Sequence, residues 1–171
     1  MVLLMRFSLL PAFITDKLTD LTPEFLKQQG IDLLMLDFDN TIVPYTTSTP
    51  TAKMRDWLEE MVKSDIELCV VSNSHKDRVK IFCEKYGIDC ITHAKKPFSK
   101  GICECLYKYQ IAPENCALVG DQIFTDTLGA NCTGVTSILV KAINNHNIWL
   151  KLRHGLEMPF ILMARKRRVK L

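Results

Sequence analysis

The sequence IDLLMLDFDNT, at residues 31–41, joins a short apolar run to two aspartates. A run of this length that is almost wholly apolar is typical of a parallel strand buried on both faces. Asp37 and Asp39 follow it, and alternation along an extended chain places both on the same side. Two neighbouring carboxylates repel each other unless a cation or a shared proton holds them. The stretch therefore predicts a buried strand whose carboxyl end carries two carboxylates held by a cation or by a shared proton. Mg²⁺ is the natural cation for such oxygen ligands.

Strand-like and helix-like patterns alternate on both sides of this stretch. Thr22 and Pro23 signal a first helix that stops at Gly30. Alternation of strands with helices predicts an α/β protein with a doubly wound, Rossmann-like parallel sheet between two helical layers. Sites in such sheets lie at the carboxyl ends of the strands. The other expected elements are helices over 51–63, 76–86, 99–110 and 125–131, and strands over 66–71, 90–91, 116–119 and 135–140.

Three further polar clusters lie beside predicted elements. SNS at 72–74 follows the second strand, and GDQIFTD at 120–126 follows the strand that ends at Val119. KKP at 95–97 precedes a helix. Taken alone, the first is an ordinary helix-capping sequence and the third an ordinary loop. Their order along the chain is what makes them informative.

The four clusters, D-x-D-x-T, Ser-Asn, Lys-Pro and G-D-x-x-x-x-D, resemble in this order the four motifs of the haloacid dehalogenase (HAD) superfamily over about residues 31–140. LTP at 21–23, AKKP at 94–97 and GDQ at 120–122 further resemble the YqeG-type subfamily of HAD class IIIA phosphatases. That subfamily is similar to the mitochondrial phosphatidylglycerophosphate phosphatases, which remove the phosphate from phosphatidylglycerophosphate. The resemblance implies a HAD-like fold and a phosphoric monoester hydrolase.

The resemblance also implies roles for the four aspartates of the motifs. Asp37 would be the nucleophile that forms an aspartyl-phosphate. Asp39 would act as general acid and then as general base. Mg²⁺ would be bound by Asp37, by the backbone carbonyl of Asp39 and by Asp121. Asp126 would either join the metal or orient its waters.

Three further residues are expected, from the same resemblance, to bind the transferring phosphoryl group. Ser72 and Lys96 would hold its oxygens, and Asn73 would assist them. A lysine is needed because the phosphate and the carboxylates concentrate negative charge, which a fixed cation stabilises in the transition state. We choose Lys96 over Lys95 because the motif lysine precedes proline.

The chain is expected to have three parts: a helical or apolar extension over 1–30, the phosphatase core over 31–140 and a basic helix or tail over 141–171. The insertions at 42–50 and 74–95 are too short for a cap domain, which would need about 50 residues. We therefore expect an open site, suited to a phosphate carried by something large or by a surface. A lipid head group fits this description.

The net charge of +3, from 22 Lys and Arg against 19 Asp and Glu, is unevenly distributed. Residues 141–171 hold eight basic residues and one acidic residue, a charge of +7, which leaves −4 for residues 1–140. The small total argues against nucleic acid as a partner of the whole surface. RKRRVK at 165–170 predicts either a solvated end or attachment to an anionic membrane, where each cation contributes about 1 kcal/mol.

The first fourteen residues, MVLLMRFSLLPAFI, predict either a helix packed on the domain or an element in a membrane interface. No run in the chain approaches the ~20 apolar residues of a spanning helix. The seven cysteines are odd in number and form no C-x-x-C. We expect reduced structural thiols in a cytoplasmic protein, at most peripheral at the inner face of the membrane, with zinc or redox chemistry as the alternative for the thiols.

Two alternatives to a lipid phosphatase remain open. One is an enzyme for a soluble nucleotide or another small phosphomonoester. The other is an RNA- or ribosome-binding module that docks through its basic tail. RNA binding would depend steeply on salt and would disappear on removal of residues 165–171. The sequence carries no signal for an oligomeric state.

Overall fold

A computed structural model describes residues 7–74, 77–144 and 148–164, with side chains from Gly155 onward in the last range. Six strands form one sheet in the order β1-β6-β5-β2-β3-β4, and every neighbouring pair is parallel. This confirms the α/β class and the doubly wound parallel sheet. The strands are β1 (Phe13–Thr15), β2 (Leu33–Leu36), β3 (Glu67–Val71), β4 (Asp89–Ile91), β5 (Cys116–Gly120) and β6 (Thr136–Val140).

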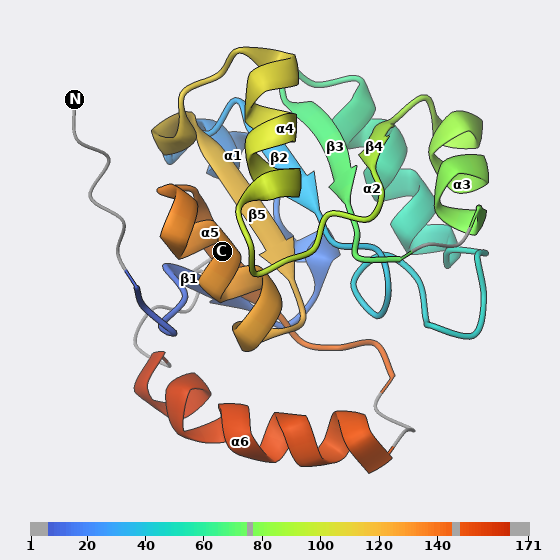
Figure 1. The fold of residues 1–171 in the computed structure, drawn as a ribbon. Coiled ribbons are helices and arrows are strands. Elements are labelled where there is room, and N and C mark those ends of the chain that lie inside the picture. The colour runs from blue at the N-terminus through green and yellow to red at the C-terminus, as the bar shows by residue number, and fades with distance from the viewer. Residues whose placement is uncertain (1–6, 75–76, 145–147, 165–171) are drawn as a thin grey trace.

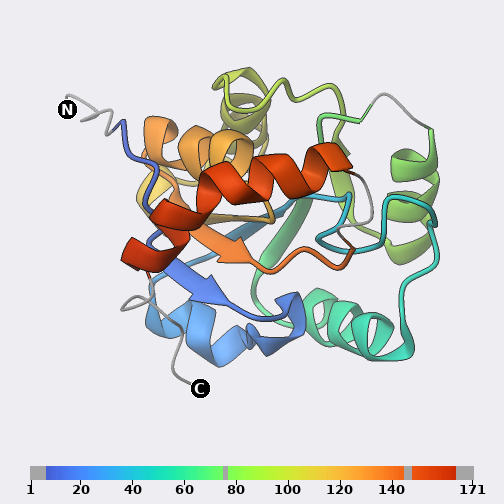
Figure 2. The ribbon, with the colours of Figure 1, turned by 90° about the horizontal axis from the view of Figure 1, so that it is seen from below.

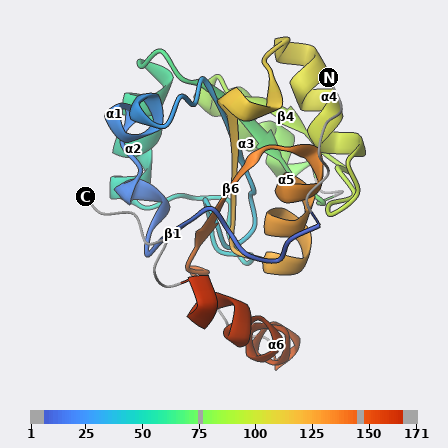
Figure 3. The same cartoon turned by 90° about the vertical axis from the view of Figure 1, so that its left-hand side faces the viewer.

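Helices cover both faces of the sheet and produce three layers. On one face lie α1 (Pro23–Gln28), α2 (Ala52–Val62) and α3 (Arg78–Tyr86); on the other lie α4 (Lys100–Tyr109) and α5 (Leu128–Thr133). Figure 3 shows α1 and α2 separated from α4 and α5 by the sheet. Leu34 and Leu36 of β2 pack against the first group, whereas Leu33 and Met35 pack against the second. The strand is wholly apolar because alternate side chains enter two different cores.

Capping residues explain where the first helices begin. The Thr22 hydroxyl accepts a hydrogen bond from the Phe25 backbone N–H at 3.2 Å, and Pro23 opens α1. The Thr51 hydroxyl accepts from the Met54 backbone N–H at 3.3 Å at the start of α2. Each cap supplies an acceptor for a backbone N–H that the first helical turn cannot pair.

The N-terminal segment differs from the expected helix. Phe13–Thr15 forms β1 and adds to the sheet edge beside β6, with Phe13 opposite Ile138. For these residues the helical interpretation is wrong, because aromatic and β-branched side chains suit a strand and Pro11 interrupts any helix that precedes them. Residues 1–6 lie outside the described residues. The first part of the chain therefore contributes a strand to the core sheet.

The last described helix, α6 (Ile148–Ala164), lies beyond the carboxyl ends of the strands. Figure 1 shows it below the sheet, and Figure 2 shows it crossing the molecule in front of β6. The buried Glu157 carboxylate accepts hydrogen bonds from the backbone N–H groups of Ile123 at 2.9 Å and Phe124 at 3.4 Å. In the described residues, no helix combines the length and the apolarity that crossing a membrane requires. The basic cluster at 165–170 lies outside the described residues.

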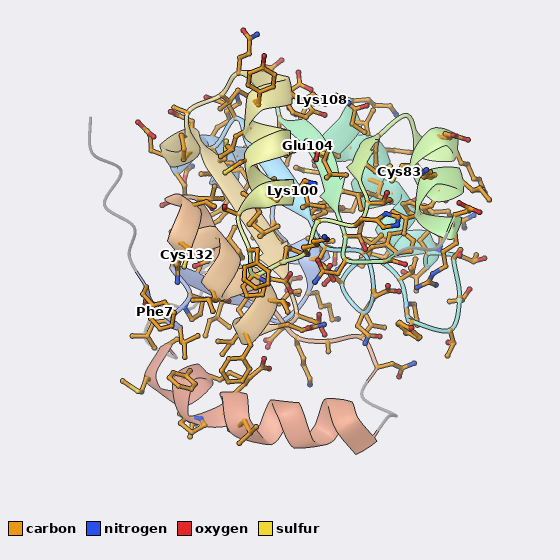
Figure 4. The ribbon with its side chains drawn as sticks, viewed as in Figure 1. Phe7, Cys83, Lys100, Glu104, Lys108 and Cys132 are labelled. Atoms are coloured by element: carbon orange, nitrogen blue, oxygen red, sulfur yellow. The ribbon has the colours of Figure 1, made fainter. Side chains whose placement is uncertain are left out.

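All seven cysteines are free thiols, and none of them forms a disulfide. Four are buried, including Cys83 on α3, whereas Cys132 on α5 is half-buried (Figure 4). Burial raises the pKa of the Cys116 thiol to about 12. A thiol with such a high pKa is a weak nucleophile and a weak metal ligand, which supports a packing role for this cysteine.

The outer face of α4 shows the amphipathic pattern expected of a surface helix. Lys100, Glu104 and Lys108 are exposed and follow one another along the helix (Figure 4), whereas Ile102 and Cys105 are buried against the sheet. Spacings of three and four residues on each face are typical of an amphipathic surface helix.

Candidate active site

Four predicted site residues meet at the carboxyl edge of the sheet. Asp37 follows β2 and Asp121 follows β5, while Asp126 lies in a π-helical turn, η3 (Ile123–Thr127). Their carboxylate oxygens lie within 4.8 Å of one another. The Lys96 Nζ lies 2.7 Å from Asp37 Oδ1 and 2.7 Å from Asp126 Oδ1. All four side chains are buried, so the cluster is formed inside the fold rather than on its surface.

Charge in this cluster is unbalanced, because three carboxylates face one ammonium. Burial raises the pKa of the Asp126 carboxyl to about 6, opposed by Lys96 and assisted by the Asp37 carboxylate. Burial alone would lower the pKa of the Lys96 ammonium, but Asp126 and Asp37 outweigh it and the pKa is raised. Three buried carboxylates offer hard oxygen ligands together with excess negative charge. This donor set fits a divalent cation such as Mg²⁺.

The position of Asp126 depends on a residue without a side chain. A Cβ atom on Gly120, the last residue of β5, would overlap the Asp126 carboxyl group. Gly120 thus lets the carboxylate lie against the strand end. The Gln122 backbone N–H donates to Asp126 Oδ2 at 3.2 Å and fixes its direction. The spacing of the G-D-x-x-x-x-D motif therefore has a steric reason.

The residues after β3 approach the same edge. The side chain of Asn73 makes a reciprocal pair with the backbone of Lys96: its Nδ2 donates to the Lys96 carbonyl at 2.9 Å, and its Oδ1 accepts from the Lys96 N–H at 2.7 Å. Asn73 therefore positions the backbone of the lysine. The buried Ser72 hydroxyl accepts from the Ser74 N–H at 3.1 Å. Contact of Ser72, Asn73 or Lys96 with a phosphoryl group stays a prediction.

Asp39 is not among the clustered carboxylates, and it pairs with a residue that had no predicted role. Its Oδ1 forms an ion pair with Nη2 of Arg78, the first residue of α3. The Arg78 guanidinium also lies 5.1 Å from the Phe38 ring centroid and 5.5 Å from that of Tyr45. Its Nη1 donates to the Thr47 carbonyl at 2.8 Å. An arginine at the start of a helix carries no sequence signal that separates it from a solvated surface residue.

A second residue without a predicted role is Thr41. Its hydroxyl is buried and donates to Asp37 Oδ2 at 3.4 Å. Together with Lys96, which contacts Oδ1, it fixes both oxygens of the Asp37 carboxylate. The threonine of D-x-D-x-T was visible in the sequence as part of the motif, but its partner was not.

The arrangement suits transfer of an anionic group. Two positive charges would attract phosphoryl oxygens here: a divalent cation held by the three carboxylates, and the Lys96 ammonium. Asp37, with its orientation fixed, can serve as a nucleophile. Asp39, paired with Arg78, is a second carboxylate that can exchange a proton.

Comparison with known proteins finds phosphatases that are similar to most of this chain. A family model described as mitochondrial PGP phosphatase matches residues 1–143. A protein of Bacillus subtilis (strain 168), "Probable phosphatase YqeG", is 36% identical over 131 residues, which cover 77% of this chain and 76% of that protein. Identity at this level over most of both sequences shows a common family.

Solved structures show the same fold at lower identity. The 3-deoxy-D-manno-octulosonate 8-phosphate phosphatase of Yersinia pestis aligns with a TM-score of 0.53 at 18% identity, over 83% of this chain and 86% of that one. The hypothetical protein XCC2798 of Xanthomonas campestris aligns with a TM-score of 0.57 at 11% identity, over 90% and 93% of the two chains. By the family model and the Bacillus subtilis relative, the chain belongs to the mitochondrial PGP phosphatase family.

Proposed function

We propose that the protein is a Mg²⁺-dependent phosphatase that hydrolyses a phosphomonoester through an aspartyl-phosphate on Asp37. The observation that carries this proposal is the buried cluster in which Lys96 contacts Asp37 and Asp126 at 2.7 Å each, beside Asp121. A nucleophile, a fixed cation and a ligand set for a divalent cation occupy one strand edge. These are the parts that phosphoryl transfer requires.

The proposed reaction has two steps. In the first, Asp37 attacks phosphorus, the bond from phosphorus to the alcohol oxygen breaks, and Asp39 donates a proton to that oxygen. In the second, Asp39 takes a proton from water, the water oxygen bonds to phosphorus, and the bond from phosphorus to Asp37 breaks. Inorganic phosphate leaves, Asp37 is again a carboxylate and Asp39 again carries its proton.

The other residues hold charge in place during both steps. Lys96 and Ser72 bind phosphoryl oxygens, and Asn73 keeps the Lys96 backbone in position through its two hydrogen bonds. Asp37, Asp121, Asp126 and the backbone carbonyl of Asp39 would hold Mg²⁺. When bound, Mg²⁺ neutralises negative charge on the phosphoryl oxygens.

For the substrate we propose phosphatidylglycerophosphate, which the enzyme would convert to phosphatidylglycerol. The match to the PGP phosphatase family model supports this choice. So do the exposed side chains of Leu156, Leu162 and Met163 on α6, which in the sequence come shortly before the basic residues of 165–170. Apolar side chains beside several cations suit peripheral contact with an anionic membrane.

The experiment is phosphate release from phosphatidylglycerophosphate in mixed micelles, measured beside a panel of nucleotides, with and without Mg²⁺. We expect Mg²⁺-dependent release with kcat/KM higher for the lipid than for every nucleotide. Asp37→Asn should abolish release, whereas Asp65→Asn, at an exposed position before the amino end of β3 and so at the opposite end of the strand from the site, should not change it. Faster hydrolysis of a nucleotide than of the lipid would overturn the substrate, and full activity of Asp37→Asn would overturn the mechanism.

A further inference from the structure

A cavity of about 490 Å³ lies beside the carboxylate cluster. Ile14 of β1 and Leu139 of β6 line its sheet side, Met158 and Ile161 of α6 line the opposite side, and Asp121 stands at its edge. The volume falls in the range of small-molecule sites, roughly 300–1,000 Å³. Its position between the strand ends and α6 makes the helix one wall of a pocket that reaches a predicted metal ligand.

The cavity also approaches the general acid. Lys141 and Ala142 continue from β6 along its lining. The next residue, Ile143, donates its backbone N–H to the Asn40 carbonyl at 2.9 Å. Asn40 directly follows Asp39 in the chain. The lining therefore extends from Asp121 toward the loop that carries the proton donor for the leaving alcohol.

The lining is apolar over most of its surface but also holds polar groups. Aliphatic and thioether side chains predominate, and the polar side chains are those of Thr15, Asp16, Asp121 and Lys141. Such a pocket favours an amphiphilic group over a sugar or a nucleoside, which need many polar partners. We propose that this cavity is the binding subsite for the apolar part of the leaving alcohol, and that α6 supplies the substrate-facing wall. This inference rests on the proposed phosphatase function and deepens it by assigning a binding place to the apolar part of the substrate.

Contacts from the active-site turn hold α6 in this place. Glu157, only 2% exposed, accepts from the backbone of Ile123 and Phe124 in η3, the turn that also carries Asp126. The rings of Phe124 and Phe160 meet edge to face at 6.3 Å. A carboxylate that accepts two backbone N–H groups is a strong, directional anchor. The subsite wall and a metal-binding aspartate are thus fixed to the same turn.

The test uses n-alkyl phosphates of increasing chain length, all monomeric in solution, with Mg²⁺ and the full chain. We expect kcat/KM of the unmodified protein to rise with each methylene group, by at most about fourfold per group, until the cavity is filled. Ile161→Trp fills the cavity from the helix side and Ala142→Leu fills it from the sheet side. Both should flatten this dependence. Leu162→Trp, at an exposed neighbouring position on α6, should keep the full dependence and should leave kcat/KM for ethyl phosphate within about threefold.

The outcomes separate this proposal from the proposed function. No dependence on chain length in the unmodified protein, or an equal dependence in both cavity-filling variants, would overturn the subsite even if phosphatidylglycerophosphate is hydrolysed. A chain-length dependence that both variants flatten supports the subsite even if nucleotides prove better substrates than the lipid. Thermal unfolding identifies a variant that fails to fold, and in that case the other variant, whose substitution comes from the opposite wall, decides the result.

Discussion

Asp39 differs from the other three aspartates of the site because it has its own cationic partner, Arg78. Asp37, Asp121 and Asp126 share one buried region with Lys96, whereas Asp39 faces the Arg78 guanidinium, which is stacked near Phe38. A carboxylate with its own cation is insulated from the repulsion inside the cluster. The D-x-D spacing predicted that two carboxylates would lie at one strand end. It could not predict Arg78, because that partner comes from a different helix.

Replacing Arg78 should alter the proton-transfer step. For Arg78→Gln we expect kcat to fall about 10-fold, since general acid–base catalysis contributes roughly 10²–10⁴-fold and is only partly lost. Loss of Arg78 leaves the Asp39 carboxyl group without the side chain that orients it, so proton transfer should slow while substrate binding is unchanged. The measurement is kcat and KM at one pH. Arg55→Gln, an exposed arginine on α2, is the control. A higher KM with an unchanged kcat would contradict this role of Arg78.

Asp126 should make the metal-free protein less stable as the pH rises. Its pKa is raised to about 6 in the folded protein, mainly by burial, so the folded state binds its proton more tightly than the unfolded state. Between about pH 4 and about pH 6 the unfolding free energy should therefore fall with rising pH, by at most about 3 kcal/mol. Urea unfolding in EDTA at several pH values measures this, with Asp126→Asn lacking that contribution. Identical pH slopes for the two proteins would contradict the assignment.

At the scale of elements, apolar runs predicted most of the sheet but not the edge strand β1 or the irregular turn η3. β2, β3, β5 and β6 were predictable because each is buried by helices on its faces. β1 has only three residues, too few for a recognisable pattern, and it is a strand because it pairs with β6. The π-helical turn η3 was predicted as the start of a helix, and α5 begins only at Leu128. The buried Glu157 contact explains part of this difference, because it comes from 34 residues further along the chain.

Gly120→Ala should weaken metal binding without loss of the fold. The new methyl group would displace the Asp126 carboxyl, and overpacking of this kind costs about 1–3 kcal/mol of stability. We expect a higher Mg²⁺ concentration for half-maximal activity, and calorimetric titration with Mg²⁺ should give a larger Kd. Gly155→Ala is the matched control, because a Cβ there meets nothing within 4 Å. Unchanged Mg²⁺ affinity in Gly120→Ala would show that Asp126 is not needed for binding.

Glu157→Ala should release α6 from the active-site turn. The Ile123 and Phe124 amides would lose their acceptor, at a cost of about 1.5–3 kcal/mol for a hydrogen bond to a charged group. Hydrogen exchange at these two amides should become faster, and the chain-length dependence with alkyl phosphates should weaken. Glu157→Gln keeps an acceptor oxygen and should show a smaller effect. Exchange rates equal to those of the unmodified protein would refute the anchoring role.

The whole molecule combines a catalytic core with no cap in its described residues and one helix placed at the mouth of the site. The expectation of an open site therefore needs a refinement, since α6 supplies a wall beside Asp121. Part of the negative charge of residues 1–140 lies in the buried carboxylate cluster at the carboxyl edge of the sheet. The basic residues of 165–170 follow α6 in the sequence. Sequence motifs could predict the cluster because they follow strands. They could not place α6, whose position depends on packing.

The central claim is that Asp37 carries the phosphoryl group during hydrolysis. The direct measurement is mass spectrometry of the protein after rapid acid quenching of its reaction with phosphatidylglycerophosphate and Mg²⁺. We expect a phosphate on the peptide that contains Asp37, accumulation of this species in Asp39→Asn and its absence in Asp37→Asn, which should also release no phosphate. Phosphate release by Asp37→Asn at the rate of the unmodified protein would contradict the account.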